Sequence, residues 1–254
     1  MAYSVARYGW KPDLPDHRDH RLSVAPPRGE IPALVDLRGG CPPVYDQGQI
    51  GSCTANALAA LFEYERRKQA DLPDARLSRL FLYYNERKLE GTTDQDAGAQ
   101  IRDGIKSLAN TGICLESEWP YEPAKFAVEP PPDCYFNAVR DRAIDYARVP
   151  QTVNEITTCL AAGFPIAFGF SVYDNFESDE VATTGILSLP DRSDEPVGGH
   201  AVMMCGYDQA KRLFLVRNSW GAAWGQGGYF WMPYDYALNG DLADDLWTLR
   251  LVSS

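Results

Sequence analysis

A cysteine and a glutamine lie close together in the chain in a way that suits acyl transfer. Cys53 follows the run QGQIGS and opens an amphipathic stretch whose apolar residues, among them Leu58 and Phe62, recur at helical spacing. A helix N-terminus favours a thiolate through its partial positive charge and free N–H groups. Gln47, six residues before the cysteine, can direct its amide N–H groups at an oxyanion. This short run therefore predicts both a nucleophile and a charge stabiliser.

The partner base that such a thiol needs is predicted to lie far downstream. His17 and His20 belong to a proline- and charge-rich N-terminal stretch, which leaves His200, at the start of an apolar run typical of a buried strand. A second such run ends at Asn218, whose amide can hydrogen-bond the imidazole and select its tautomer. We expect Trp220, two residues further on, to shield that contact from water.

These motifs resemble those of the papain family of cysteine peptidases, whose downstream His and Asn follow a known order. The resemblance extends over IPALVDLR from Ile31, GICLESEWPY from Gly112 and NSWGAAWGQGGYFWM from Asn218, and so covers the chain from Ile31 to its C-terminus. It implies an α+β, two-lobed papain-like fold with a helical lobe, an antiparallel β-barrel-like lobe and an active site in the cleft between them.

The resemblance also implies a role for each of the four polar residues. Cys53 would be the nucleophile, His200 the general acid and base, and Asn218 the residue that orients the imidazole. Gln47 would donate to the oxyanion together with the backbone N–H of Cys53. The implied activity is peptide-bond hydrolysis through a thioester acyl-enzyme, without a metal or organic cofactor. An acyl or peptidyl transferase or ligase, and a peptide-binding protein without turnover, are the alternatives.

Two residues beside the nucleophile depart from the family pattern. Ile50 stands where family members usually have a disulfide cysteine, and Thr54 replaces the usual aromatic residue. Neither position carries the chemistry, so we expect the departures to affect stability and pocket shape more than reactivity. A buried structural thiol is the alternative interpretation of Cys53.

The expected substrate contacts follow from the resemblance. The glycine pair that binds the substrate backbone in the family falls on Gly98 and Ala99, and we expect Ala99 to offer its backbone groups. Trp220 is also expected near the substrate. The remaining expected pocket residues are a small one beside the scissile bond, two apolar wall residues and two acidic residues at the base of the main specificity pocket: Gly199, Ala167, Val197, Asp244 and Asp245. An acidic base would favour Arg or Lys, whereas surface charges are the alternative interpretation of the two aspartates.

Periodicity and punctuation divide the chain into two parts. Helical spacing dominates residues 40–135, with helices expected after Cys53, around 78–88 and around 99–109. Short apolar runs separated by Gly, Pro and Asp dominate residues 140–240 and indicate antiparallel strands: IAFGF, GILSL, AVMMCGY, LFLVRN and GYFWM. The proline-rich residues 122–133 are expected to form an extended crossing or a surface loop. We predict one peptidase domain over 31–254, preceded by an N-terminal extension, 1–30.

Composition limits the classes of partner. A net charge of −11 argues against nucleic acid, and no apolar run approaches the ~20 residues that span a bilayer. Peptide or protein substrates and a monomer are expected. The opening residues lack the apolar region of a signal peptide, so the expectation is a cytoplasmic protein if Met1 is the natural start, or an exported one if a signal was removed.

The six cysteines include no C-x-x-C pair, so a zinc site is not expected. If Cys53 is catalytic, Cys159 and Cys205 are expected to be core thiols because each lies in an apolar run. Cys41 is left to form a disulfide with Cys114 or with Cys134.

The N-terminal extension is shorter than the helical propeptides of the family. Trp10 and several prolines among charged residues suit an extended segment rather than a folded domain. We predict that residues 4–28 lie across the enzyme and cover part of the cleft, inhibiting it; a disordered tail is the alternative. The extension and the loop 190–199 are both candidates for blocking the groove in an exopeptidase.

Overall fold

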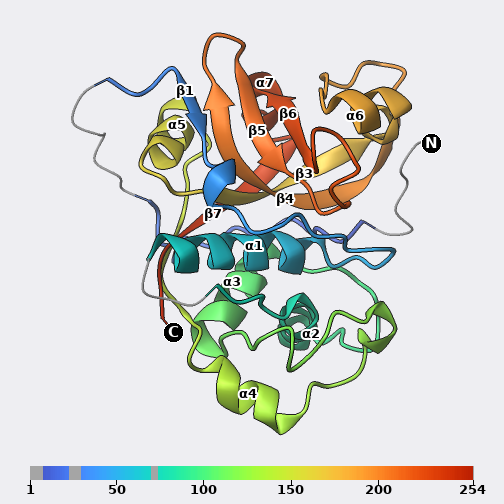
Figure 1. The fold of residues 1–254 in the computed structure, drawn as a ribbon. Helices are drawn as coiled ribbons and strands as arrows, with labels where there is room; N and C mark the ends of the chain where they lie inside the picture. Colours follow the sequence, from blue (N-terminus) through green and yellow to red (C-terminus); the bar gives the residue numbers. More distant parts are fainter. Residues whose placement is uncertain (1–7, 23–29, 70–73, 254) are drawn as a thin grey trace.

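The computed structural model describes residues 8–22, 30–69 and 74–253, which form a helical layer and a sheet layer (Figure 1). The α-helices are α1 Cys53–Lys68, α2 Arg79–Glu90, α3 Ile101–Asn110, α4 Pro132–Ala138, α5 Val153–Ala161, α6 Asp179–Thr184 and α7 Tyr234–Ala237, and the short 3-10 helices are Arg38–Gly40, Pro123–Lys125 and Asp174–Glu177. The strands are β1 Leu34–Asp36, β2 Ala143–Arg148, β3 Ile166–Tyr173, β4 Pro196–Asp208, β5 Leu213–Arg217, β6 Tyr229–Pro233 and β7 Ala243–Val252. None of the described helices is long and apolar enough to cross a membrane.

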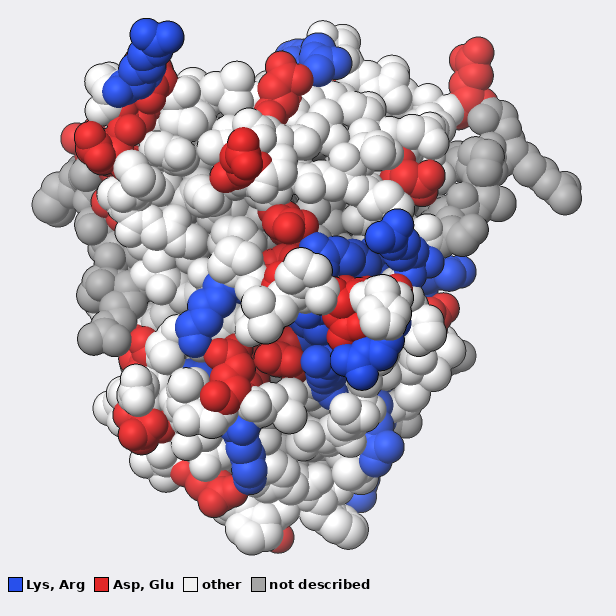
Figure 2. Space-filling view, turned by 180° about the vertical axis from the view of Figure 1, so that it is seen from behind, with Lys and Arg blue, Asp and Glu red and all other residues white. Residues whose placement is uncertain are grey.

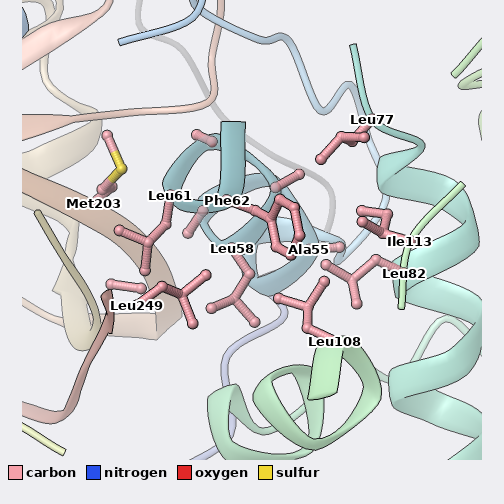
Figure 3. Close-up of a cluster of buried hydrophobic side chains, with 14 of the residues drawn as sticks. Ala55, Leu58, Leu61, Phe62, Leu77, Leu82, Leu108, Ile113, Met203 and Leu249 are labelled. Carbon is pink, nitrogen blue, oxygen red and sulfur yellow. The ribbon is translucent and has the colours of Figure 1, made fainter. Parts of the chain in front are cut away.

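Helix α1 joins the two layers because it is apolar on both sides. Figure 3 shows Leu61 beside Met203 and Leu249 of the sheet, and Phe62 on the side of the other helices. Leu58, Leu61 and Phe62 are fully buried, and burial of each such side chain contributes about 1.5–3 kcal/mol. Three basic residues in the last turn suit the negative end of the helix dipole. The packing holds the N-terminus of α1 against the sheet.

The sheet is antiparallel, with the strand order β2-β7-β3-β4-β5-β6 and β1 added on β4. The described strands form an open sheet, so the barrel-like closure that the family resemblance implies is absent from the described residues. The long central strand β4 pairs with β5 on one edge and with β3, followed further along by β1, on the other, and it sets His200 opposite Phe170. This register fixes the position of the imidazole relative to α1.

One local prediction from the sequence is wrong, and a second holds only in part. Residues 185–189 (GILSL) form no strand, because Gly185 ends α6 in the left-handed region at φ 64° and only Ile186 makes a single bridge, to Trp231. Residues 122–133 are not extended throughout. The 3-10 helix Pro123–Lys125 and the start of α4 interrupt the segment, because proline is well tolerated in a first helical turn.

The cysteine pairing also differs from the prediction. All six cysteines are free and buried, so Cys41 bonds neither Cys114 nor Cys134. Cys41 instead lies beside Cys205, and that thiol lowers the pKa of Cys41. Cys114 lies beside Cys134, and both thiols are buried. The pairs form across distant parts of the chain, which sequence spacing does not reveal.

Residues 8–22, named the strap here, lie across the body of the protein and pass behind α1 in Figure 1. At one end Trp10 N donates to Gly199 O at 2.9 Å, and at the other Leu22 N donates to Arg148 O at 2.8 Å. Side chains of the strap form ion pairs with Arg102 and Arg148 of the body. Of the predicted segment 4–28, residues 4–7 and 23–28 lie outside the described residues.

Candidate active site

Cys53 is the first residue of α1 and is fully buried. The sequence predicts a lowered pKa for a thiol at this position, but burial raises the pKa of Cys53 to about 11. Hydrogen bonds from the backbone N–H groups of Ala201 and Gly9 act in the opposite direction without overcoming the loss of water. The helix terminus is present as predicted, and the strap covers it. In this closed state Cys53, the predicted nucleophile, is therefore a protonated thiol.

His200 and Asn218 meet as the sequence order predicts. Their side-chain atoms Nε2 and Oδ1 are 2.8 Å apart, and both residues are buried. The N–H of Ser219 also donates to Asn218 Oδ1 at 2.8 Å, which identifies that atom as the carbonyl oxygen. His200 Nε2 must then carry the proton. Nδ1, which has no hydrogen-bond partner among the described residues, keeps its lone pair.

Aromatic rings enclose the imidazole. The ring centroid of Trp220 lies 5.1 Å from that of His200, with Phe170 at 5.8 Å and Tyr8 of the strap at 5.9 Å. This burial lowers the pKa of His200 to about 4, while the hydrogen bond that its Nε2–H donates to Asn218 raises it. The covered histidine is therefore neutral at pH 7, and Trp220 occupies the shielding position expected for it.

Gln47 is fully buried and is linked to Asn218 through hydrogen bonds of Ser219. Its Oε1 accepts a hydrogen bond from Ser219 Oγ at 2.6 Å, and its Nε2 donates to Ile50 O at 3.0 Å. Ser219 thus bonds both Gln47 and Asn218. Sequence reasoning passed over this serine, although it stands inside the Asn-Ser-Trp-Gly motif. Its contacts orient the Gln47 amide so that Nε2 is the group left to donate.

The two residues that depart from the family pattern lie behind the nucleophile. Thr54 Oγ1 donates to Glu86 Oε2 at 2.7 Å, and burial raises the pKa of Glu86 far above its ordinary value. Ile50 packs partly buried against the core. Thr54 therefore makes a buried hydrogen bond where the family usually has an aromatic packing residue.

Backbone groups at the predicted substrate positions bind the strap. Ala99 N donates to Gly9 O at 2.7 Å, and Ala99 O accepts from Lys11 N at 3.1 Å. Gly98 has φ 68°, and a Cβ there would lie 2.1 Å from Gly9 O, so this position has room for glycine alone. Gly199 is equally close, since a Cβ would lie 2.7 Å from Trp10 O. Sequence reasoning did not foresee that Gly9 and Trp10 would occupy these contacts.

The remaining predicted pocket residues separate into two groups. Ala167 is fully buried and belongs to the same apolar cluster as Trp10, whereas Val197 is 42% exposed. Asp245 is fully buried and accepts a hydrogen bond from Trp10 Nε1 at 3.1 Å. The side chain of Asp244 is 46% exposed and pairs with Arg148. The surface-charge interpretation therefore fails for Asp245, which lies next to the strap inside the cleft.

The geometry can support acyl transfer once the cleft is open. The Cys53 thiol opens a helix and contacts the backbone of Ala201, the residue after His200. Asn218 orients the imidazole, whose Nδ1 has no partner among the described residues, and hydrogen bonds hold the Gln47 amide in place; all three side chains are buried. Among the described residues no group of three or more His, Cys, Asp or Glu side chains could hold a metal ion.

Comparisons with known proteins agree with this arrangement. The family model described as "Papain family cysteine protease" matches residues 31–245. The crystal structure of xylellain, a cysteine protease from Xylella fastidiosa, is 44% identical with a TM-score of 0.88, covering 96% of this chain and 95% of that one.

Two curated proteins extend the comparison. An uncharacterized peptidase C1-like protein of Acanthamoeba polyphaga mimivirus is 44% identical over 82% of this chain and 70% of its own length. Procathepsin L of Felis catus is 30% identical over 81% of this chain and 62% of its own length, so the chain spans less than two thirds of that relative. The chain belongs to the papain family of cysteine proteases.

Proposed function

We propose that the chain hydrolyses peptide bonds through a thioester formed on Cys53. In the open enzyme, Nδ1 of His200 takes the thiol proton, and the sulfur attacks the peptide carbonyl carbon. The imidazolium then gives its proton to the leaving amine and afterwards activates a water, which releases the acid. Asn218 holds the imidazole in the tautomer that this proton transfer needs, because its Oδ1 accepts from Nε2. The hydrogen bonds that link His200, Asn218, Ser219 and Gln47 carry the proposal.

The oxyanion would bind to Gln47 Nε2 and the backbone N–H of Cys53. Gln47 Oε1 is held by Ser219, so the amide cannot turn its oxygen toward the anion without losing that hydrogen bond. Loss of one oxyanion donor costs about 10²–10³ in kcat in a hydrolase of this kind. A Gln47→Ala variant should therefore lose about that much of its kcat, with a smaller change in KM.

The strap is proposed to keep the enzyme inactive. Gly9 presents its backbone N–H to the thiol, while its carbonyl oxygen is bound by Ala99 N. The strap thus meets the thiol through an N–H group, an arrangement that would make it a poor substrate at this position. One family relative is named as a procathepsin, consistent with control by an N-terminal segment.

The test compares three forms of the full chain. The native chain should turn over fluorogenic peptide amides slowly. A double variant, Gly9→Ala with Trp10→Ala, should do so faster because the strap no longer fits. Cys53→Ala in that double variant should abolish turnover. Products formed in the presence of an added amine separate hydrolysis from transfer. Absence of turnover in the folded double variant would refute the proposal.

A further inference from the structure

The Trp10 side chain of the strap fills a slot beside the nucleophile. The residue is only 9% exposed, although it lies in a segment with no secondary structure of its own. Two glycines form the walls. A Cβ on Gly169 of β3 would lie 1.9 Å from the indole ring, and one on Gly199 of β4 would lie 2.8 Å from it. The slot exists because these two strand residues have no side chain.

A carboxylate closes the far end of the slot. Asp245 Oδ2 accepts from Trp10 Nε1 at 3.1 Å and from Asp13 N at 2.7 Å, and both donors belong to the strap. Asp245 Oδ1 is bound by Arg148 at 2.9 Å. When the strap leaves, Oδ2 loses two donors while Oδ1 keeps its own. A buried acceptor that loses its partners favours any ligand that brings a new N–H group.

The backbone around Asp245 is shaped to present this carboxylate. Asp245 has φ 57°, in the left-handed region that non-glycine residues seldom adopt. The register between β3 and β7 shifts at this point, since Gly169 pairs with Asp244 and Ala167 with Trp247. A bulge of this type turns a side chain out of the strand alternation, and such bulges are common beside active sites.

The charge around Asp245 is already balanced by the body of the protein. Arg148 pairs with both Asp244 and Asp245, and Arg102 lies on the same side of the strap, where it pairs with Asp19. Figure 2 shows acidic and basic side chains mixed across the middle of this face. Without the strap, the positive charges of Arg102 and Arg148 balance the negative charges of Asp244 and Asp245. The slot therefore offers a hydrogen-bond acceptor without a net negative charge.

We infer that this slot is the main side-chain specificity pocket and that it selects tryptophan, with Asp245 as the residue that determines the choice. The inference rests on the proposed peptidase function. A flat ring fits between the two glycines, and an N–H at its tip satisfies Asp245. Phenylalanine fits the slot without supplying the N–H, and a cationic side chain meets Arg148 behind the carboxylate. This replaces the preference for Arg or Lys expected from an acidic pocket base.

The first test needs no turnover and uses the full chain. Trp10 is changed to Phe, Arg or Leu, and the rate at which iodoacetamide alkylates Cys53 reports how often the strap leaves. Trp10→Phe removes the N–H donor and should raise the alkylation rate about tenfold. Trp10→Arg and Trp10→Leu should also exceed the native rate. Equal rates for the native chain and Trp10→Phe, or slower alkylation of Trp10→Arg, would overturn the inference.

Asp245→Asn and Asp244→Asn form the matched pair of variants. In Asp245→Asn the Asn oxygen keeps the Arg148 hydrogen bond, which turns the NH₂ group toward the indole and removes the acceptor. The difference in Cys53 alkylation rate between chains with Trp10 and chains with Trp10→Phe should then disappear. Asp244→Asn should retain it, because Asp244 does not touch the indole. Persistence of the difference in Asp245→Asn would overturn the inference.

The second test measures turnover in the full chain carrying Gly9→Ala and Trp10→Ala. A fluorogenic peptide library varies each position on both sides of the scissile bond. At one position kcat/KM should be about tenfold higher for Trp than for Phe, and Asp245→Asn should remove that ratio. Equal values, or a preference for Arg, would overturn the specificity. If the alkylation series agrees but no peptide is cleaved, the pocket preference stands and the proposed peptidase function fails.

Discussion

A single methyl group on Gly9 should open the active site. An ideal Cβ at this position would lie 1.7 Å from the carbonyl oxygen of Gly51 and 2.4 Å from its carbonyl carbon. Both are backbone atoms directly before the Cys53 helix, so neither can move aside as a flexible side chain would. In Gly9→Ala the strap must therefore shift away from the thiol.

The size of the effect follows from the cost of overpacking. An added methyl group in a close-packed site costs about 1–3 kcal/mol, which is about 5- to 160-fold in the ratio of open to closed enzyme. While the closed state dominates, the initial rate of peptide hydrolysis and the alkylation rate of Cys53 should rise by the same factor. Because strap docking also stabilises the folded chain while the closed state dominates, the melting temperature should fall by about 2–4 °C for each kcal/mol of docking free energy lost.

Gly39→Ala is the matched control. A Cβ there meets no atom within 4 Å, so the variant should behave like the native chain. If Gly9→Ala leaves both rates unchanged while its strap sequence is otherwise intact, the close contact with Gly51 does not control access. If hydrolysis and alkylation respond by different factors, the strap does more than cover the nucleophile.

Three further outcomes are expected. Ser219→Ala should lower kcat about tenfold with little change in KM, because Gln47 loses the partner that orients it; steady-state kinetics of the opened enzyme check this. Burial, followed by the charge of Asp245, raises the pKa of Asp13 to about 7 in the docked strap, from about 4 for a free aspartate. Between pH 4 and pH 7, docking of the strap is therefore accompanied by uptake of a proton. Docking should therefore weaken as pH rises through this window, and Asp13→Asn should remove the dependence from the activity ratio of native and opened chains. Leu58→Ala should cost about 2–5 kcal/mol of unfolding free energy in urea, because the side chain is fully buried.

The sequence predicts the parts of this protein that depend on local order. The helix after Cys53 and the strand that carries His200 follow from periodicity, and Asn218 follows from its place at the end of the next apolar run. Cys53 and Asn218 lie at the boundaries of α1 and β5, and His200 lies inside β4; in each case the neighbouring residues determine the element. Family resemblance then supplies the pairing of distant elements, and here the family is established by residues 31–245.

Features that depend on contacts between distant segments could not be predicted. Nothing in the sequence around Trp10 says that its indole would lie between Gly169 and Gly199, because those glycines look like ordinary strand residues. The left-handed conformation of Asp245 is equally hidden, since neither a glycine nor a turn motif marks it. The pKa of Cys53 was predicted in the wrong direction because helix position is local, whereas burial depends on the strap.

The inhibition that we propose for the strap would be electrostatic as well as steric. In the closed state burial raises the pKa of Cys53 and lowers that of His200, so the neutral forms of both groups are favoured, and the strap contributes to this burial through Gly9 and Tyr8. An ion pair between thiolate and imidazolium needs solvent or other dipoles to stabilise it. The aromatic rings around His200 supply little of this, and Tyr8 of the strap is one of them. Removal of the strap should therefore change the charge state of the pair at the moment it exposes the sulfur, so that access and reactivity rise together.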